Sequence, residues 1–411
     1  MGAVEGLGRT RRDRITRLGQ LALPLTAGAV SWLVPLAFTT GFGGAMSDFD
    51  IYLGGARSIF THAQMYADGP NQFVYPPIAA ILFLPFLLGP ALLWKILWAF
   101  ASWAALMAVV HRLGLRGWAG SVAAAVAIGT ATPVTMATRL GQIEILLTCL
   151  VILDLVPGSR PSGRRVIPLP AGWLVGLVTA IKLTPALFIV HLLLTRRWRA
   201  ALTATVTAAG LTLIGFALLP GDSVFYWGRL ATTGSVGFAS DPIYLDNQSV
   251  RGAILRLFKL GPAAGPVALA LAGVCIAIGL FAARRLSRRG LEGAAVVLVG
   301  LATALASPVS WTHHFVWIVP LAVILLTHRT GRLVAVSGTL LVVWLWLAPY
   351  SALPAGGMKE LDYTAGEILL SGVTPVLGLV LLVGALMTDV GSTARRTEPT
   401  RPETKPASTR S

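Results

Sequence analysis

Apolar stretches of about twenty residues recur along most of this 411-residue chain, separated by short polar turns. Only 12% of the residues are charged, whereas a soluble domain carries about 25%. A chain this apolar cannot cover its surface in water, and runs of this length are long enough to cross a bilayer as helices. The sequence therefore predicts an all-α integral membrane protein.

The basic residues predict how the protein is oriented. Lys and Arg number 33 against 17 Asp and Glu, which gives a formal net charge of +16. Most of them lie near the chain ends and in one alternating set of loops, the distribution that marks the cytoplasmic side. No nucleic-acid-binding motif accompanies them, so we assign the charge to topology and to attraction for lipid headgroups. We expect a multi-pass protein of a bacterial plasma membrane, with both termini cytoplasmic and no nucleic-acid partner.

The apolar runs predict a bundle of about twelve membrane segments, some of them short or re-entrant. The expected regions are a basic cytoplasmic N-terminus over residues 1–19, a transmembrane catalytic domain over 20–387 and a disordered cytoplasmic tail over 388–411. Within the middle region, residues 43–75 and 220–262 are predicted as outer loops.

Residues 171–195 lie between two basic, cytoplasmic loops and must return to the side from which they start. Twenty-five residues do this only as two half-length helices, with the break at Lys182-Leu183-Thr184-Pro185. Broken helices of this kind occur where the backbone lines a cavity rather than lipid. The break would place Lys182 at or just below the outer surface.

Polar side chains from distant parts of the chain fall on the outer side in this topology. Ionisable residues near a membrane core are costly, so they mark functional sites by default. The candidates are Asp48, Asp50, Tyr52, Tyr75, Arg139, Gln142, Lys182, Asn247, Gln248, Arg251, His313 and His314, with Glu144 at the same level. No Walker loop, Rossmann fingerprint or His/Cys metal cluster occurs in the sequence. We therefore expect no cofactor, and the sequence leaves metal assistance open.

The spacing of Asp48-Phe49-Asp50 leaves two geometries open. In an extended segment both carboxylates share a face, whereas in a helix they diverge by roughly 200°. The helical case frees one Asp to point into a cavity, with Tyr52 beside Asp48, where a carboxylate serves as general base. A helix cap or a solvated loop acid is the alternative.

The cations are candidates for binding an anion. A lysine between half-helices binds phosphate with help from the N-terminus of the following helix, and snorkelling to the interface is the alternative for Lys182. Arg139 and the His313-His314 pair are interfacial anchors or ligands of a phosphate or sugar. Two further groups have structural alternatives: Tyr75 before Pro76 fixes a helix entry, and the Asn247, Gln248 and Arg251 group binds hydroxyls or caps an outer loop.

Six motifs follow one another along the chain. They are Ser47-Asp48-Phe49-Asp50-Ile51-Tyr52, Val74-Tyr75-Pro76-Pro77, Gly141-Gln142, Ile181-Lys182-Leu183-Thr184-Pro185, Asn247-Gln248-Ser249-Val250-Arg251-Gly252 and Ser307-Pro308-Val309-Ser310-Trp311-Thr312-His313-His314. The ordered set resembles the actinobacterial polyprenol-phosphate-mannose-dependent α-1,2-mannosyltransferases of glycosyltransferase family 87, which have the GT-C membrane fold. The resemblance covers roughly residues 20–390.

This resemblance implies an inverting transfer of mannose on the extracytoplasmic, periplasmic face. The donor would be polyprenyl-phosphate-mannose, and the acceptor a mannosylated lipid or lipoglycan: a phosphatidylinositol mannoside, lipomannan or lipoarabinomannan. The family's base falls on Asp48, its motif lysine on Lys182 and its histidine pair on His313 and His314. Arg139 and Gln142 are expected beside the donor, and Asp50, Tyr52, Tyr75, Asn247, Gln248 and Arg251 beside the substrates.

Two other functions remain open on the sequence. An arabinofuranosyltransferase would use the same fold with a different donor sugar. A flippase or transporter of lipid-linked sugars would show paired inverted halves with matching breaks, which the sequence does not display. Loss of Asp48 would impair a transferase more than a transporter.

Overall fold

The structure, a computed structural model, describes residues 16–31, 46–61, 64–66, 72–158, 169–234 and 242–387. Within them the regular secondary structure is helical, and β structure is limited to isolated bridges such as Asn247 with Trp311. The prediction of an all-α protein is confirmed. The predicted C-terminal tail, residues 388–411, and most of the basic N-terminus lie outside the described residues.

Four described helices are long and apolar enough to cross a membrane. They are α4 (Ala91–Arg112), α10 (Trp198–Leu218), α13 (Ala264–Ser287) and Arg332–Ala352, which joins α16 (Arg332–Leu347) to the 3₁₀ turn η4 (Pro349–Ala352). Two bent pairs raise the count to six if each is one span. This is a membrane protein, and the larger number of segments predicted from the sequence is not confirmed.

The two bent pairs each change direction at a break in the helix. The pairs are α5 (Gly117–Thr130) with α6 (Thr132–Leu140), bent by 67°, and α17 (Ala365–Ser371) with α18 (Val373–Met387), bent by 48°. Pro133 lies in the first turn of α6, where its missing N–H is tolerated. The same proline lacks the donor that a continuous helix needs, so the chain changes direction there.

The remaining described helices are shorter. They are α2 (Ser47–Thr61), α3 (Pro77–Leu82), η2 (Leu84–Leu87), α7 (Glu144–Leu155), α8 (Trp173–Ile181), α9 (Ala186–Leu194), α11 (Pro220–Thr233), α12 (Val250–Leu257), α14 (Glu292–Ala306), η3 (Thr312–Trp317), α15 (Ile318–Thr327) and η5 (Lys359–Asp362). The break between α8 and α9 falls at Lys182, as the sequence predicts.

The two predicted outer loops contain helices, which is a correction. Residues 43–75 include α2, whose first turn carries Asp48 and Asp50 at the end where negative charge is favourable. Residues 220–262 include α11, which has Pro220 at its first position, and α12, which Ser249 caps through the backbone N–H of Gly252.

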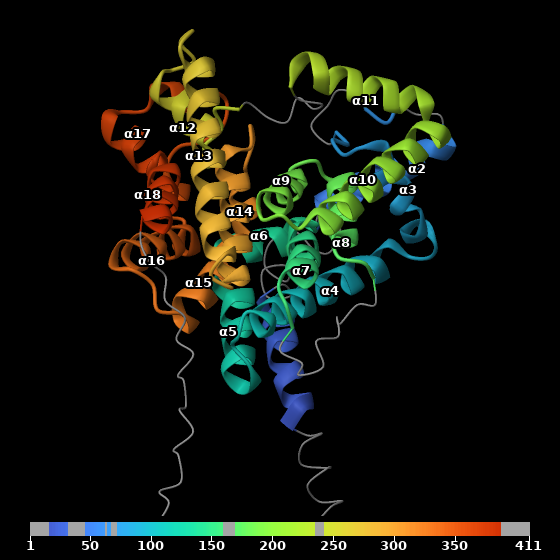
Figure 1. The fold of residues 1–411 in the computed structure, drawn as a ribbon. Coiled ribbons are helices and arrows are strands. Elements are labelled where there is room, and N and C mark those ends of the chain that lie inside the picture. Colours follow the sequence, from blue (N-terminus) through green and yellow to red (C-terminus); the bar gives the residue numbers. More distant parts are fainter. Residues whose placement is uncertain are drawn as a thin grey trace, which may run out of the picture.

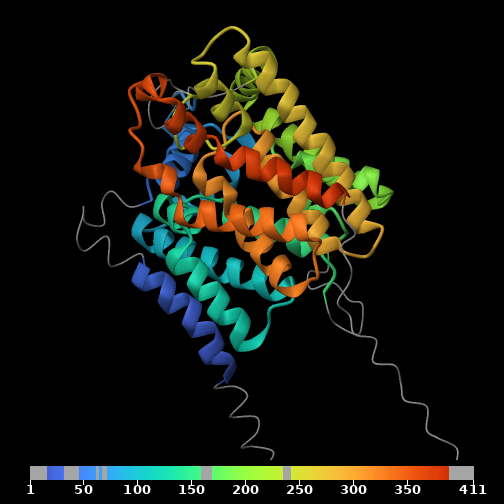
Figure 2. The same cartoon turned by 90° about the vertical axis from the view of Figure 1, so that its left-hand side faces the viewer.

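The helices surround a central group formed by α6, α7, α14 and η3. Figure 1 shows α2, α3 and α10 on one side of the bundle and α16, α17 and α18 on the other, with α13 and α14 between them. In Figure 2 the helix over residues 16–31, in dark blue, runs beside α5. Small residues allow close packing here, because Gly19 faces Trp118 of α5 and Gly28 faces Trp103 of α4. The turn η3 contacts α6, α7, α14 and α15, which places His313 and His314 in the interior.

Candidate active site

Helix α2 directs its two acidic side chains to different partners. The Asp48 carboxylate accepts a hydrogen bond from the Gln142 side-chain amide. The Asp50 carboxylate instead binds Lys95 of α4, with 2.7 Å between Nζ and Oδ2. The divergence expected of a helical segment is therefore present. Asp50 was predicted to bind substrate, but the structure engages one of its oxygens with Lys95 and leaves its side chain about half exposed.

Two buried tyrosines hold the Gln142 amide in one orientation. The Tyr52 hydroxyl donates to Gln142 Oε1 at 3.2 Å and lies 3.1 Å from the Tyr75 hydroxyl. The two tyrosine rings meet edge to face, with their centroids 5.2 Å apart. Because Oε1 accepts from Tyr52, the amide nitrogen faces Asp48 as a donor. Tyr52, Tyr75 and Gln142, all predicted from the sequence, therefore lie beside Asp48.

Gly141 makes the close approach of α2 to this corner possible. It ends α6 with φ at 73°, a left-handed conformation that favours glycine. A Cβ at this position would lie 2.9 Å from the Cβ atoms of both Met46 and Phe49. The backbone N–H of Met46 donates to the carbonyl of Arg139 at 2.9 Å, which ties the start of α2 to the end of α6.

Replacing Gly141 by Ala is expected to lower the free energy of unfolding by about 1–3 kcal/mol, since it adds backbone strain to a clash with α2. Thermal unfolding of the purified protein in detergent measures this loss. Gly129→Ala is the matched control, because a Cβ on Gly129 of α5 meets nothing within 4 Å. A smaller loss for Gly141→Ala than for Gly129→Ala would contradict the close approach.

A second polar group forms where the break between α8 and α9 meets α7. Lys182 Nζ binds a carboxylate oxygen of Glu144, at the first position of α7. His314 Nε2 lies 3.3 Å from the same oxygen and 3.4 Å from Lys182 Nζ. Sequence reasoning assigned no role to Glu144. Its only signal was its position two residues after Gln142, at the level of the other outer polar groups.

Several polar atoms around this group are buried and have no hydrogen-bond partner in the part of the chain that the structure describes. They are both ring nitrogens of His313, Oε2 of Glu144 and the hydroxyl of Ser310. His313 itself is only 3% exposed. Unpaired buried polar atoms are rare in native proteins and call for a water, an ion or a ligand. Their clustering here indicates a binding site.

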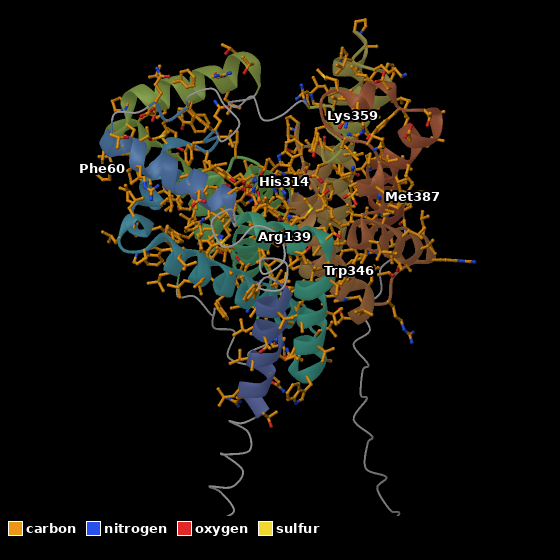
Figure 3. All side chains as sticks on the ribbon, turned by 180° about the vertical axis from the view of Figure 1, so that it is seen from behind. Phe60, Arg139, His314, Trp346, Lys359 and Met387 are labelled. Atoms are coloured by element: carbon orange, nitrogen blue, oxygen red, sulfur yellow. The ribbon has the colours of Figure 1, made fainter. Side chains whose placement is uncertain are left out.

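The two groups belong to one site. Lys182 Nζ lies 5.7 Å from the centroid of the Tyr75 ring, so the lysine group reaches the tyrosine group that orients Gln142. A cavity beside them is lined by Glu144, Lys182, Thr184, Ser307, Ser310 and His314, with apolar walls. In Figure 3, His314 and Arg139 lie near the middle of the molecule, whereas Phe60 and Met387 lie at opposite sides. Neither Asp48 nor Gln142 lines the cavity, and the contacts that lead from them to Lys182 at its wall pass through Tyr52 and Tyr75.

Asn247 and Gln248 hold the histidine turn in place. The backbone N–H of Ser310 donates to Asn247 Oδ1 at 2.9 Å, and the backbone N–H of Gln248 donates to the Ser310 carbonyl at 2.8 Å. Gln248 also donates to the Leu245 carbonyl and accepts from Thr374. Both amides are 0% exposed. We therefore correct their predicted role from binding substrate hydroxyls to positioning the turn.

Arg139 and Arg251 stay candidates on their positions alone. Arg139 is exposed in the last turn of α6, and Arg251 is half-buried in the first turn of α12. Among the described residues, no group of three or more His, Cys, Asp or Glu side chains is arranged to hold a metal ion. The site thus contains the Asp48 carboxylate held by the Gln142 amide, the Glu144 carboxylate paired with Lys182, and the two histidines of the adjoining turn.

Comparison with known proteins identifies the family. The model of glycosyltransferase family 87 matches residues 73–308. The chain belongs to glycosyltransferase family 87. No solved structure gives a significant match. The resemblance drawn from the ordered motifs is confirmed, and so is the prediction of a glycosyltransferase.

Named relatives cover most of the chain. A polyprenol-phosphate-mannose-dependent alpha-(1-2)-phosphatidylinositol mannoside mannosyltransferase of Mycobacterium tuberculosis is 32% identical over 375 residues, which are 80% of this chain and 84% of the relative. The protein of the same name from Mycolicibacterium smegmatis is 33% identical over 349 residues, 75% of this chain and 76% of the relative. A polyprenol-phosphate-mannose-dependent alpha-(1-2)-phosphatidylinositol pentamannoside mannosyltransferase of Mycobacterium tuberculosis is 33% identical over 355 residues, 81% and 77%.

Proposed function

We propose that this family 87 protein transfers mannose from polyprenyl-phosphate-mannose to a mannosylated lipid acceptor, forming an α-1,2 linkage on the extracytoplasmic face. The single observation that carries this proposal is one chain of contacts: Gln142 and two tyrosines join Asp48 to the Lys182, Glu144 and His314 group beside a cavity. The names of the relatives supply the donor and the acceptor class. They favour mannose over the arabinofuranose alternative, and a transfer reaction over transport.

The proposed reaction is a single displacement. The acceptor hydroxyl gives its proton to the Asp48 carboxylate while its oxygen forms a bond to the anomeric carbon of mannose. The bond from that carbon to the phosphate oxygen breaks, and its electron pair leaves with the phosphate. Lys182 and the His313-His314 turn stabilise the departing anion, so no separate acid is needed. Inversion at the anomeric carbon turns a β-linked donor into an α-linked product.

The orientation of the site supports the same proposal. Arg284 and Arg285 lie in the last turn of α13, and Arg332 begins α16. Helix α14 begins shortly after the end of α13 and runs to Ala306, next to the histidine turn. Under the positive-inside rule, the arginine ends face the cytoplasm and the Asp48 and His314 end faces the periplasm. A lipid-linked donor reaches such a site from within the outer leaflet.

The test is a transfer assay with membranes that contain the overproduced protein. Radiolabelled polyprenyl-phosphate-mannose is the donor, and a panel of phosphatidylinositol mannosides is the acceptor. Labelled product that α-1,2-mannosidase releases supports the proposal. Transfer from a decaprenyl-phosphate-arabinofuranose donor instead, or movement of the donor across the membrane without transfer, would replace it with one of the two alternatives.

The rate of transfer is expected to fall as pH is lowered through the pKa of Asp48, because the base must be deprotonated. Burial raises this pKa above its ordinary value of 3.8, against the opposing hydrogen bonds from Ser47 and Gln142. The acid limb of the kcat/KM profile should therefore lie above the range of an ordinary aspartate. In Gln142→Leu the limb should move to still higher pH, since a donor that favours the carboxylate is lost. A limb that stays in place or moves lower in this variant would exclude Asp48 as the titrating group.

A further inference from the structure

Arginines gather at the end of the bundle opposite the histidine turn. Helix α13 ends at Ser287 and α14 begins at Glu292, and the two run beside each other (Figure 1). The six arginines here, which we call the arginine corner, are Arg196, Arg197, Arg284, Arg285, Arg288 and Arg289. α14 separates the corner from the histidine turn by roughly 22 Å, at 1.5 Å per residue over its 15 residues. The arginine corner is therefore a separate place from the proposed transfer site.

Two cavities open onto the arginine corner. One is lined by Arg196, Arg197 and Arg288 together with Thr195 and Ser287 at the end of α9 and α13. The other is lined by Arg284, Arg285, Arg288 and Arg289, together with the apolar side chains of Phe281 and Leu386. Arg288 lines both cavities, so they form one continuous basic surface. Such basic pockets between membrane helices fit anionic lipid headgroups.

Among the described residues, the arginines of this corner outnumber the acidic side chains that line its cavities. Glu292 is the one acid that lines either cavity, and it is engaged by Arg197 at 3.7 Å and by the Ser287 hydroxyl at 3.1 Å. Within the described part of the chain, the side chains of Arg196, Arg284 and Arg288 have no hydrogen-bond or ion-pair partner, and Arg284 Nε is buried. Guanidinium groups match phosphate oxygens with paired hydrogen bonds. The guanidinium groups of Arg284 and Arg288 can therefore bind a phosphate from outside the protein.

Apolar surface adjoins the basic surface, and this decides the class of ligand. Phe281 lines the second cavity and is 53% exposed. Val274, seven residues earlier on the same face of this helix, is also exposed, at 43%. A phosphate group alone would leave this strip uncovered, whereas a phospholipid places an acyl chain along it.

We propose that the arginine corner binds the headgroup of an anionic phospholipid, with the phosphate between Arg284 and Arg288 and an acyl chain along Phe281. The bound lipid would neutralise the positive charge of the arginines where α9 meets α10 and where α13 meets α14. Both of these helix pairs connect the corner to the histidine turn or to Lys182, so the lipid would stabilise the bundle that holds the site.

The experiment measures binding on the full-length protein purified in a neutral detergent, with no donor present, so its outcome is independent of the proposed transfer. Thermal unfolding is followed with increasing dioleoyl phosphatidylglycerol, dioleoyl phosphatidylcholine or inorganic phosphate, and native mass spectrometry counts the retained lipids. We expect phosphatidylglycerol to raise the unfolding temperature, with little effect of the other two. In Arg284→Gln/Arg288→Gln, the apparent affinity for phosphatidylglycerol should fall roughly tenfold or more.

Two comparisons distinguish binding at the arginine corner from a non-specific effect of positive charge. Arg329→Gln/Arg332→Gln removes the same charge from an exposed basic turn between α15 and α16 that lines neither cavity, and it should retain wild-type affinity. If the double variant unfolds, the affinity for phosphatidylglycerol is measured in Arg288→Gln alone, which alters only an exposed side chain. Equal losses in both double variants would overturn the proposal, and so would equal protection by the two lipids. Full protection by inorganic phosphate would assign the site to free phosphate and overturn it as well.

Discussion

Replacing Asp48 by Asn is expected to reduce the rate of mannosyl transfer by roughly 100-fold or more, the usual contribution of a general base. The amide keeps the size of the side chain and can still accept from Gln142, but it cannot take the acceptor's proton. The loss should appear in kcat, with little change in KM for the lipid donor. Initial rates in the membrane assay measure it, at protein levels matched by immunoblot.

Asp50→Asn is the matched control for this prediction. It removes an acid two positions away on the same helix, and the new amide oxygen can still accept from Lys95. Because Asp50 points to α4 rather than to Gln142, we expect this variant to retain most of its transfer activity. Equal losses in the two variants would show that the acids serve the fold of α2, or hold a metal together, rather than that Asp48 acts as base.

Replacing Lys182 by Gln is expected to lower transfer by roughly 100- to 1,000-fold, the scale for loss of one group that stabilises a developing anion. Lys182 lies at the helix break beside His314, and the cavity opens next to its ammonium group. The effect should be on kcat and on inhibition by the polyprenyl phosphate product, which would bind more weakly. Product-inhibition constants measured in the same membranes test the phosphate role directly.

A double variant separates two explanations for that loss. Lys182 binds Glu144, so its removal leaves a buried carboxylate without its cation. Lys182→Gln/Glu144→Gln removes both charges, which relieves this penalty while leaving the phosphate without its ligand. We expect the double variant to regain stability in thermal unfolding and to stay inactive. Recovery of transfer would mean that Lys182 serves only to neutralise Glu144.

Glu144 shows what spacing along the chain cannot reveal. Its carboxylate is within reach of Lys182 and His314, which are 38 and 170 positions away in sequence. This carboxylate keeps Lys182 and His314 together, and a donor phosphate would compete for the same two partners. The sequence indicated only that Glu144 lay at the right depth in the membrane, because a pairing across three helices leaves no local pattern.

Whereas Glu144 was given no role from the sequence, Asn247 and Gln248 were given a substrate-binding role that the structure does not support. Their polar side chains, placed on the outer side, were consistent with a site for sugar hydroxyls. In the structure, however, the Asn247 amide makes a hydrogen bond to the backbone of Ser310, and the Gln248 amide makes hydrogen bonds to Leu245 and Thr374. Buried amides must be satisfied, and the irregular chain before His313 offers the unpaired backbone groups that satisfy them. Which of the two roles a polar residue takes depends on what packs against it.

The sequence alone determined the helical class, the membrane environment, the break at Lys182 and the family, because hydropathy, proline placement and ordered motifs are properties of the chain read locally. The tertiary structure alone decided which acid of the Asp48 and Asp50 pair faces the site, how Gln142 is oriented, and that Glu144 joins Lys182 to His314. Only the structure, too, revealed the bends after α5 and α17 and the helices inside the outer loops. The physical reason is that a side chain's charge and hydrogen bonds are settled by neighbours from distant helices, which meet only when the bundle packs.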